Sequence, residues 1–344
     1  MLDQRSIIAI LKAAAEPTRL RILVLLMAGE LNVKDLTRIL GQSQPRISRH
    51  LKLMAEAGLI ERHRDGSWAY FQLVETGPAG ALLRGLLDTI DRSDPALARD
   101  AKRAESVKRE REAAAQDYFR THAAEWDRIR ALHISEGEVE SALRHALGEG
   151  PFELLVDLGT GTGRMLELFQ PSYRRGLGFD VNHQMLDYAR GKLQAAGLTQ
   201  ASVRHGDLYD VPLADGAANA VIMHQVLHFL AEPAQSIREA ARLLGPGGKL
   251  AIIDFAPHDV EFLRDTFAHE RLGFPAGLVN EWLAAAGLDV VTANDLVPQA
   301  DAGAGKLTVT LWLAERPGAA ETSAKQSIIA KSAGARLRAE KVEA

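Results

Sequence analysis

LLVDLGTGTG, residues 154–163, is the stretch of this 344-residue chain that decides its fold. A short apolar run ends at Asp157, and Gly159, Gly161 and Gly163 follow before a helical pattern begins. A continuous apolar run of this length is typical of a buried strand in a parallel sheet. Glycines directly after it allow a tight turn and a close approach of the backbone to a ligand. The stretch therefore predicts a strand, turn and helix at the carboxyl edge of an open α/β sheet, where nucleotides bind.

The nucleotide class follows from the spacing and from the strands that come next. The glycine spacing, G-x-G-x-G, differs from the G-x-G-x-x-G of dinucleotide-binding domains. Further strands are expected at 174–180, 202–207, 218–223 and 249–254, and two of them end in Asp180 and Asp207. An acid at the second strand end is where ribose hydroxyls are held. A glycine-rich turn in some other doubly wound domain, with ordinary solvated acids, is the alternative.

Together these motifs resemble, over residues 118–314, the Rossmann-like small-molecule methyltransferases that depend on S-adenosylmethionine (SAM). The resemblance implies a doubly wound, seven-stranded α/β domain. It also implies that Asp180 takes the ribose hydroxyls, that Asp207 and Leu208 take the adenine, and that the first two glycines take the methionine side. The expected cofactor is SAM or its demethylated product S-adenosylhomocysteine (SAH), without a metal. The expected cofactor-binding residues are Asp157, Gly159, Gly161, Gly163, Asp180, Asp207, Leu208 and His224.

Catalytic residues are harder to assign, because methyl transfer needs alignment and needs a base only if the nucleophile must lose a proton. Candidates are His224, Gln225 and His228 after the fourth strand, and Tyr118 in a helical segment, 117–133, that would cap the pocket. The aromatic residues of that segment could equally be core packing. The two histidines have the i,i+4 spacing of a metal pair, but no zinc-binding helix motif accompanies them. A packed or substrate-facing histidine pair is therefore favoured.

Residues 4–73 show a different pattern, a run of short helices followed by a hairpin. One apolar stripe contains Ile7, Ile8, Leu11 and Ala15, and helices are expected at 18–27, 33–40 and 43–57. The last of these is expected to start with a Ser43 cap and to bury Ile47, Leu51 and Met54. Two strands joined by a tight Asp65-Gly66 turn should follow. Two helices, the second basic on its outer face, followed by a hairpin wing form a DNA-reading arrangement.

The run QPRISRHLKLMAEAGLIERHRDGSWAYFQL, residues 44–73, resembles the winged helix-turn-helix of the ArsR family of bacterial repressors, over about residues 4–74. By this resemblance the fourth helix enters the major groove of an operator in double-stranded DNA. A merely solvated basic helix face is the alternative. The expected DNA-contacting residues are Gln44, Arg46, Ser48, Arg49 and His50 on the helix, with Arg62 and Arg64 on the wing.

Metal sensing, which is common in that family, is not expected here. The family's E-L-C-V-C-D-L segment reads Glu30-Leu31-Asn32-Val33-Lys34-Asp35-Leu36, and neither asparagine nor lysine replaces a thiolate ligand. The following helix, 78–92, contains no histidine. The second domain is then the expected source of the signal.

The expected domains are a winged-helix and dimerisation domain at 1–93, a charged helical connector at 94–116 and a SAM-binding domain at 117–315. A tail at 316–344 is expected to be disordered. The connector contains no glycine and reads as a stiff solvated helix, which could couple the domains or act only as a spacer. The repressor resemblance implies a homodimer that pairs residues near 7–15 and 81–90.

Composition narrows the functional class. The chain has no cysteine, which excludes a disulfide framework and cysteine nucleophiles, and its net charge is -4. No apolar run reaches the length of a membrane span, and the first residues lack an export pattern, so a cytoplasmic protein without a membrane partner is expected. A DNA methyltransferase is not expected, because the cytosine type needs a cysteine and the amino type needs a Pro-Pro-aromatic motif where this chain has MHQVLHF.

Two hypotheses remain. The first is a transcription regulator, repressor-like, whose methyltransferase-type domain binds SAM or SAH as its signal. The second is an active SAM-dependent methyltransferase for a small-molecule methyl acceptor, with an autoregulatory DNA-binding domain.

Overall fold

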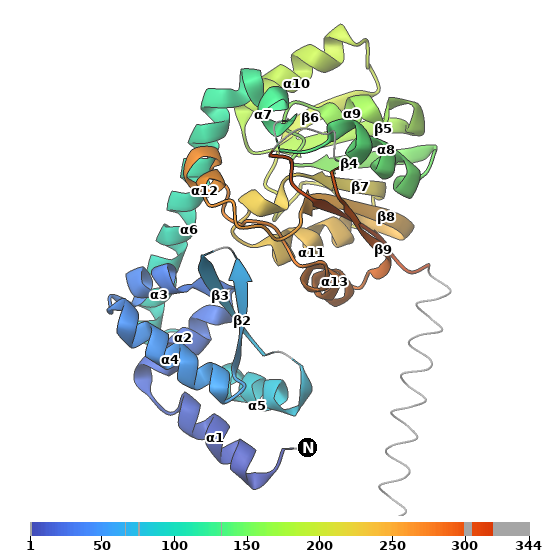
Figure 1. Ribbon diagram of the computed structural model, residues 1–344. Helices are drawn as coiled ribbons and strands as arrows, with labels where there is room; N and C mark the ends of the chain where they lie inside the picture. The colour runs from blue at the N-terminus through green and yellow to red at the C-terminus, as the bar shows by residue number, and fades with distance from the viewer. Residues whose placement is uncertain (1, 66, 75, 132, 299–304, 319–344) are drawn as a thin grey trace, which may run out of the picture. The chain divides into compact units, whose positions relative to one another are not determined.

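The computed structural model describes residues 2–65, 67–74, 76–131, 133–298 and 305–318 (Figure 1). The chain divides into two compact units. Unit 1 comprises Met1–Tyr118, Phe229–Glu232 and Pro257–Gly273, and unit 2 comprises Phe119–His228, Pro233–Ala256 and Phe274–Ala344. The predicted tail lies mostly outside the described residues. Within those residues, no helix has the length and apolar character needed to cross a membrane.

Unit 1 contains a winged helix-turn-helix. Its helices are α1 (Gln4–Ala14), α2 (Pro17–Leu26), α3 (Val33–Leu40), α4 (Gln44–Glu56), α5 (Gly77–Asp88), α6 (Pro95–His122, which runs four residues into unit 2) and α12 (Phe262–Phe267). Its strands are β1 (Leu31–Asn32), β2 (Ile60–Asp65) and β3 (Trp68–Leu73), paired in the order β1-β3-β2. Local chemistry sets the helix ends: Asn32 and Asp35 form a capping box for α3, and Gly41 ends it with φ 64°.

Helix α4 and the wing match the prediction with two corrections. Ile47, Leu51 and Met54 are buried as predicted, at 0–1% exposure. Ser43 occupies the N-cap position, but its side chain makes no capping hydrogen bond. The turn is shifted by one residue, because Asp65 is the last residue of β2 and pairs with Trp68. Gly66 itself lies outside the described residues.

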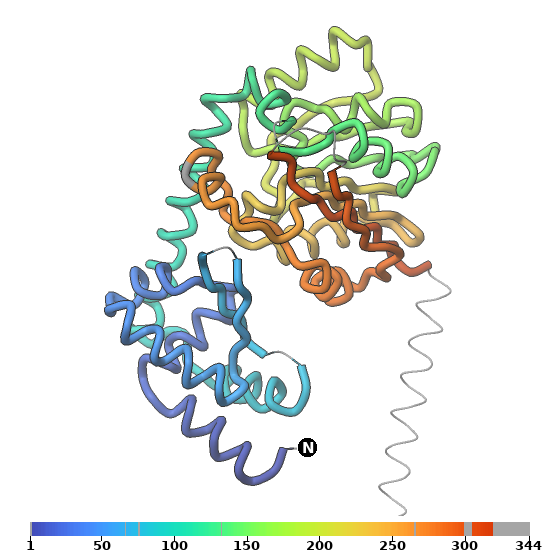
Figure 2. The backbone as a smooth tube through the Cα atoms, in the orientation of Figure 1, coloured from blue at the N-terminus to red at the C-terminus, as the bar shows by residue number. Residues whose placement is uncertain are grey.

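The predicted connector, 94–116, is part of unit 1 and is not solvated on all sides. It forms most of α6, which Figure 2 shows as one uninterrupted helix, coloured teal. Asp100 is 2% exposed and receives two hydrogen bonds from Arg21, at 2.5 and 2.7 Å. Arg111 of α6 forms an ion pair with Asp35, the N3 residue of α3. These pairs fix the first part of α6 against the winged helix of unit 1.

Unit 2 contains the predicted doubly wound sheet, with strand order β6-β5-β4-β7-β8-β10-β9. The first five strands of this order are parallel, and β10 is antiparallel to both neighbours. The order reverses between β4 and β7, which is where doubly wound sheets bind ligands. The strands are β4 (Phe152–Leu158), β5 (Tyr173–Asp180), β6 (Ala201–His205), β7 (Ala218–His224), β8 (Leu244–Phe255), β9 (Asp289–Leu296) and β10 (Val309–Glu315).

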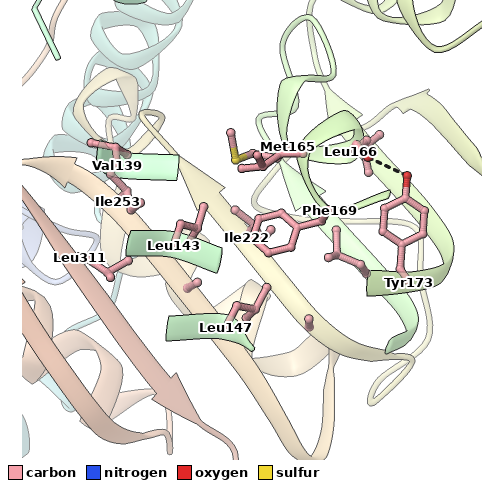
Figure 3. Close-up of a cluster of buried hydrophobic side chains, with 14 of the residues drawn as sticks. Val139, Leu143, Leu147, Met165, Leu166, Phe169, Tyr173, Ile222, Ile253 and Leu311 are labelled. Atoms are coloured by element: carbon pink, nitrogen blue, oxygen red, sulfur yellow. Dashed lines mark hydrogen bonds between the residues drawn. The ribbon is translucent and has the colours of Figure 1, made fainter. Parts of the chain in front are cut away.

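Helices cover the sheet, and one that the sequence analysis did not predict contributes to its core. The helical elements of unit 2 are η1 (Ala123–Glu125), α7 (Trp126–Ala131), α8 (Glu136–Leu147), α9 (Arg164–Leu168), η2 (Gln170–Ser172), α10 (His183–Ala195), η3 (Leu227–Phe229, whose last residue is in unit 1), α11 (Pro233–Leu243) and α13 (Ala276–Ala285). Val139, Leu143 and Leu147 of α8 are buried in one hydrophobic cluster with Ile222 and Phe169 (Figure 3). The same cluster contains Leu155 of β4, so α8 packs against the strand that leads into the glycine turn.

Candidate functional site

The glycine turn between β4 and α9 adopts a backbone shape that other residues adopt at a cost. Gly159, Gly161 and Gly163 have φ values of 73°, 49° and 81°, all in the left-handed region. A Cβ on Gly159 would lie 2.4 Å from Cγ2 of Val226. The backbone N–H of Gly159 donates to the carbonyl of Phe179 at 2.9 Å, which holds the turn against β5.

Asp180 ends β5, as predicted, and faces the same turn. One carboxylate oxygen accepts the N–H of Gly161 at 2.9 Å, and the other accepts the N–H of Asn182 at 2.8 Å. Burial raises the pKa of Asp180. An ionised carboxylate has about four acceptor positions, so Asp180 keeps capacity for the hydroxyls of a ligand.

Asp157 supports the turn from the interior. Its side chain is 1% exposed and accepts the hydroxyl of Thr160 at 2.6 Å. Burial raises the pKa of Asp157 to about 7, and the nearby Asp180 also raises it, whereas the Thr160 hydroxyl and Arg130 lower it. Its ionisation state therefore changes near neutral pH.

The residues that the resemblance assigned to adenine follow β6, which ends at His205, two residues earlier than predicted. Leu208 is buried, and Asp207 is exposed and accepts the N–H of Tyr209 at 2.9 Å. The rings of His183 and His205 stack beside these strand ends, with centroids 4.6 Å apart and planes 12° apart. The sequence analysis missed this stacked pair, because the two histidines lie on different elements and form no motif.

Two polar side chains at the end of β7 are buried with unpaired atoms. His224 and Gln225 are 8% and 4% exposed, and the Nε2 atom of each lacks a hydrogen-bond partner among the described residues. Gln225 has φ 54°, a rare conformation for a residue other than glycine. Burial, with help from Arg130 and Arg164, lowers the pKa of His224 well below its usual value, so its imidazole is neutral at pH 7. Buried polar atoms of this kind usually pair with a ligand or water.

His228 and Asp254 form a buried pair beside them. Nδ1 of His228 lies 2.7 Å from Oδ1 of Asp254, and the two residues are 2% and 0% exposed. Asp254 also accepts the backbone N–H groups of His228 and Phe255. Within the described ranges, no group of three or more histidine, aspartate or glutamate side chains could hold a metal ion.

The predicted cap lies against the glycine turn, but Tyr118 is not part of it. A Cβ on Gly161 would lie 3.6 Å from Nε1 of Trp126 in α7. Asp127 accepts the hydroxyl of Thr162 at 2.6 Å, which ties the cap to the turn. Tyr118 instead belongs to unit 1, where its ring contacts Phe267. Burial raises its pKa to about 12, which is opposite to what a general base at neutral pH needs.

Arg130 of α7 is a candidate site residue that the sequence analysis missed. Its side chain is 9% exposed and donates to Glu136 at 2.8 Å. Its positive charge lowers the pKa of both Asp157 and His224, which places it near the turn and the end of β7. One arginine among several in a charged helical segment gave no distinguishing signal.

All but one of the predicted DNA-contacting residues have exposed side chains. Arg46 and Arg49 are exposed on α4, and so are Gln44 and Ser48. Arg62 and Arg64 are exposed on β2. His50 does not join them, because its side chain is 12% exposed, lies 3.7 Å from Glu16 and has a pKa lowered mainly by burial.

Comparison with known proteins agrees with both units. A family profile described as bacterial regulatory protein, arsR family, matches residues 16–62, and one described as methyltransferase domain matches residues 156–252. The arsenical resistance operon repressor of Escherichia coli K12 is 47% identical over 75 residues, which cover 22% of this chain and 64% of that protein. A demethylmenaquinone methyltransferase of Deinococcus radiodurans is 33% identical over 157 residues, which cover 44% of this chain and 64% of that protein.

A solved structure shows the fold of unit 2. The structure is a complex between the Trm112 methyltransferase activator of Haloferax volcanii and a methyltransferase. One of its chains is 22% identical to this chain, with a TM-score of 0.51, and the match covers 59% of this chain and 97% of that one. The chain spans less than two thirds of the length of each curated relative named above. With the winged helix and the seven-stranded sheet, these matches show that the chain joins an ArsR-family DNA-binding regulator domain to a Rossmann-like methyltransferase domain.

Proposed function

We propose that this protein is a transcription regulator that binds an operator through unit 1 and binds SAM or SAH in unit 2 as its signal. The observation that carries the proposal is the presence, in one chain, of an exposed basic recognition helix and a glycine turn with an acid at the next strand end. A ligand regulates only if it binds the DNA-competent and DNA-incompetent states with different affinities.

The residues at the carboxyl edge of the sheet fit an adenosyl ligand. The glycine turn supports close backbone approach, and Asp180 supports pairing with ribose hydroxyls. Arg130 is our candidate for the ligand's carboxylate, because its guanidinium is nearly buried next to the turn. When bound, SAM supplies a methyl group on a positively charged sulfonium. The neutral imidazole of His224 does not repel that charge.

The affinity for SAM relative to SAH is expected to rise with pH. Asp157 has a pKa of about 7 and is increasingly ionised between pH 6 and pH 8. Its negative charge attracts the sulfonium, which only SAM carries, so the ratio of the two affinities should rise by roughly tenfold, or about 1.4 kcal/mol. Calorimetric titrations at several pH values measure the ratio.

Asp157→Asn is the control for this pH dependence. An asparagine can still accept the Thr160 hydroxyl but does not titrate, so the affinity ratio should be independent of pH. A ratio that rises with pH as steeply in this variant as in the wild type would assign the effect to another group.

An active small-molecule methyltransferase is the second candidate. The hydrogen bond between His228 and Asp254 favours it, because a carboxylate behind an imidazole fixes the tautomer of a general base. Incubation with isotopically labelled SAM and a pool of metabolites separates the candidates. Sustained product formation supports the enzyme, whereas ligand binding without turnover supports the regulator.

We also propose a homodimer. Ile7, Ile8 and Leu11 of α1 are 37–46% exposed, so most of the predicted apolar stripe does not pack into the core of this chain. Ile10, Ala13 and Ala14 are the buried residues of α1 instead. A second copy would cover the exposed stripe and would place two α4 helices in half-sites roughly 34 Å apart. Sedimentation equilibrium tests the oligomeric state.

The proposed function is tested by selecting DNA on the full-length protein from a random pool and measuring its dissociation constant by anisotropy. Saturating SAM or SAH should change that constant. Equal DNA affinity with and without both ligands would refute the signal.

A further inference from the structure

The chain leaves unit 2 twice, both times at the edge where the candidate ligand site lies. Residues 229–232 come just after β7 and residues 257–273 just after β8, and both belong to unit 1. The two strands are parallel neighbours, so both excursions start at the same edge of the sheet. The buried pair of His228 and Asp254 lies directly before these two departures.

Residues 257–273, the longer of these two segments, contact the tip of the wing. Nη2 of Arg264 donates to the Asp65 carboxylate at 2.9 Å and to the Asp65 carbonyl at 3.0 Å. The same carboxylate accepts the N–H of Leu272 at 2.8 Å. The two charged side chains are only 5% and 7% exposed, and the guanidinium lies 4.3 Å from the ring centroid of Trp68. Figure 2 shows this segment in orange beside the blue hairpin.

The same segment, residues 257–273, also contacts Tyr70 in the middle of the wing and residues of the neighbouring helices. Arg271 lies 3.6 Å from the ring centroid of Tyr70 and forms an ion pair with Glu30 at 2.8 Å. Glu270 accepts the Tyr70 hydroxyl at 3.1 Å and pairs with Arg111 of α6 at 2.6 Å. Loss of one partner would leave the other charge buried and unpaired, so these ion pairs favour the docked position of the segment.

Residues 229–232, the shorter segment, contact both α6 and residues 257–273. Glu232 accepts Lys108 of α6 at 2.6 Å, and the ring of Phe229 meets the ring of His269 edge to face, with centroids 5.2 Å apart. Residues 229–232 and residues 257–273 are therefore both bound to the winged-helix unit, and they also contact each other.

We propose that residues 257–273 form an intrachain clamp on the wing through which a ligand at the ends of β7 and β8 changes the affinity of unit 1 for DNA. This inference rests on the proposed function. A ligand there lies near His228 and Asp254, just before the two segments leave unit 2. A displacement of these strand ends is transmitted along the chain to residues 257–273, which contact Asp65, Trp68 and Tyr70. The wing has a docked and an undocked state, and both the ligand and DNA bias the equilibrium between them.

The test uses Arg264→Gln in the full-length protein, with Arg21→Gln as the matched control. Both variants remove an arginine that pairs with a nearly buried aspartate of unit 1. Arg264 of the clamp pairs with Asp65, whereas Arg21 of α2 pairs with Asp100 of α6. Wild-type DNA affinity should change by about 5- to 150-fold on saturation with SAH, the usual range of allosteric coupling. Arg264→Gln should reduce that factor below about twofold while SAH affinity stays within about threefold, and Arg21→Gln should keep the factor.

A full coupling factor in Arg264→Gln, with normal SAH binding, overturns the clamp. Should that variant fail to fold, Glu261→Ala replaces it, because the Glu261 side chain is 40% exposed and accepts the N–H of Ser67 at the wing tip. Glu261→Ala should lower the coupling factor, and an unchanged factor in this variant overturns the clamp as well.

Amide hydrogen exchange separates failure of the clamp from failure of the proposed function. If SAM and SAH both bind the wild type without changing its DNA affinity, the proposed function fails. The contact of residues 257–273 with the wing still predicts altered exchange in residues 60–73 on SAH binding. That alteration should disappear in the variant chosen above. Unaltered exchange in the wild-type wing overturns the clamp, and a wild type that binds neither SAM nor SAH overturns both proposals.

Discussion

Gly161→Ala is expected to weaken the binding of SAM and SAH by about tenfold or more, or about 1.4 kcal/mol, because its methyl group would block the close approach of the ligand to the turn. Backbone strain at φ 49° should in addition lower the free energy of unfolding by on the order of 1–2 kcal/mol. The added methyl group would also occupy the space between the turn and Trp126, 3.6 Å from its Nε1 atom. A ligand that relies on close backbone approach loses that space. Calorimetric titration of the purified variant measures the loss.

Gly197→Ala is the matched control for this substitution. Gly197 has φ 69°, and a Cβ there would meet no atom within 4 Å. Both variants should lose similar free energy of unfolding through strain, whereas only Gly161→Ala should lose ligand affinity. Equal ligand affinities in the two variants would show that the glycine turn is not the adenosyl site.

Arg46→Ala and Arg49→Ala are expected to weaken binding to the selected DNA by roughly 5- to 150-fold each, the loss of about 1–3 kcal/mol expected for an arginine that contacts a base. Both side chains are exposed on α4, away from the buried stripe of Ile47, Leu51 and Met54. If the arginine contacts only phosphate, its substitution should instead reduce the slope of log Kd against the logarithm of the salt concentration by about one. Anisotropy titrations at several salt concentrations distinguish the two roles.

Arg109→Ala removes the same charge from an exposed position on α6, where Arg109 pairs with Glu105. Its DNA affinity should stay within about twofold of wild type, the range expected of a change that affects only net charge. Wild-type affinity in both α4 variants would mean that α4 is not the recognition helix.

Local patterns were sufficient to predict most of the architecture. The apolar runs that predicted the parallel strands lie within β4, β5, β7 and β8, because strands buried on both faces are continuous apolar segments. The glycines of the turn were informative because their left-handed φ values are unfavourable for other residues.

Long-range pairing was beyond sequence reasoning. Asp100 and Arg111 looked like members of a solvated charge run, yet each pairs with a residue far away in the chain, Arg21 and Asp35 respectively. Residues 257–273 carry no motif, and their importance depends on Asp65, about 200 positions earlier in the sequence. No local pattern indicated that His50 lies near Glu16 or that the ring of Tyr118 contacts Phe267, because these partners belong to other elements.

The central claim, that one chain couples an adenosyl ligand to DNA binding, is tested most directly by titrating SAH into the full-length protein by calorimetry, with and without saturating selected DNA. Because linkage is reciprocal, we expect the SAH dissociation constant to change on DNA binding by the same factor by which SAH changes the DNA dissociation constant. An SAH affinity that is identical in the free and DNA-bound protein would contradict the coupling.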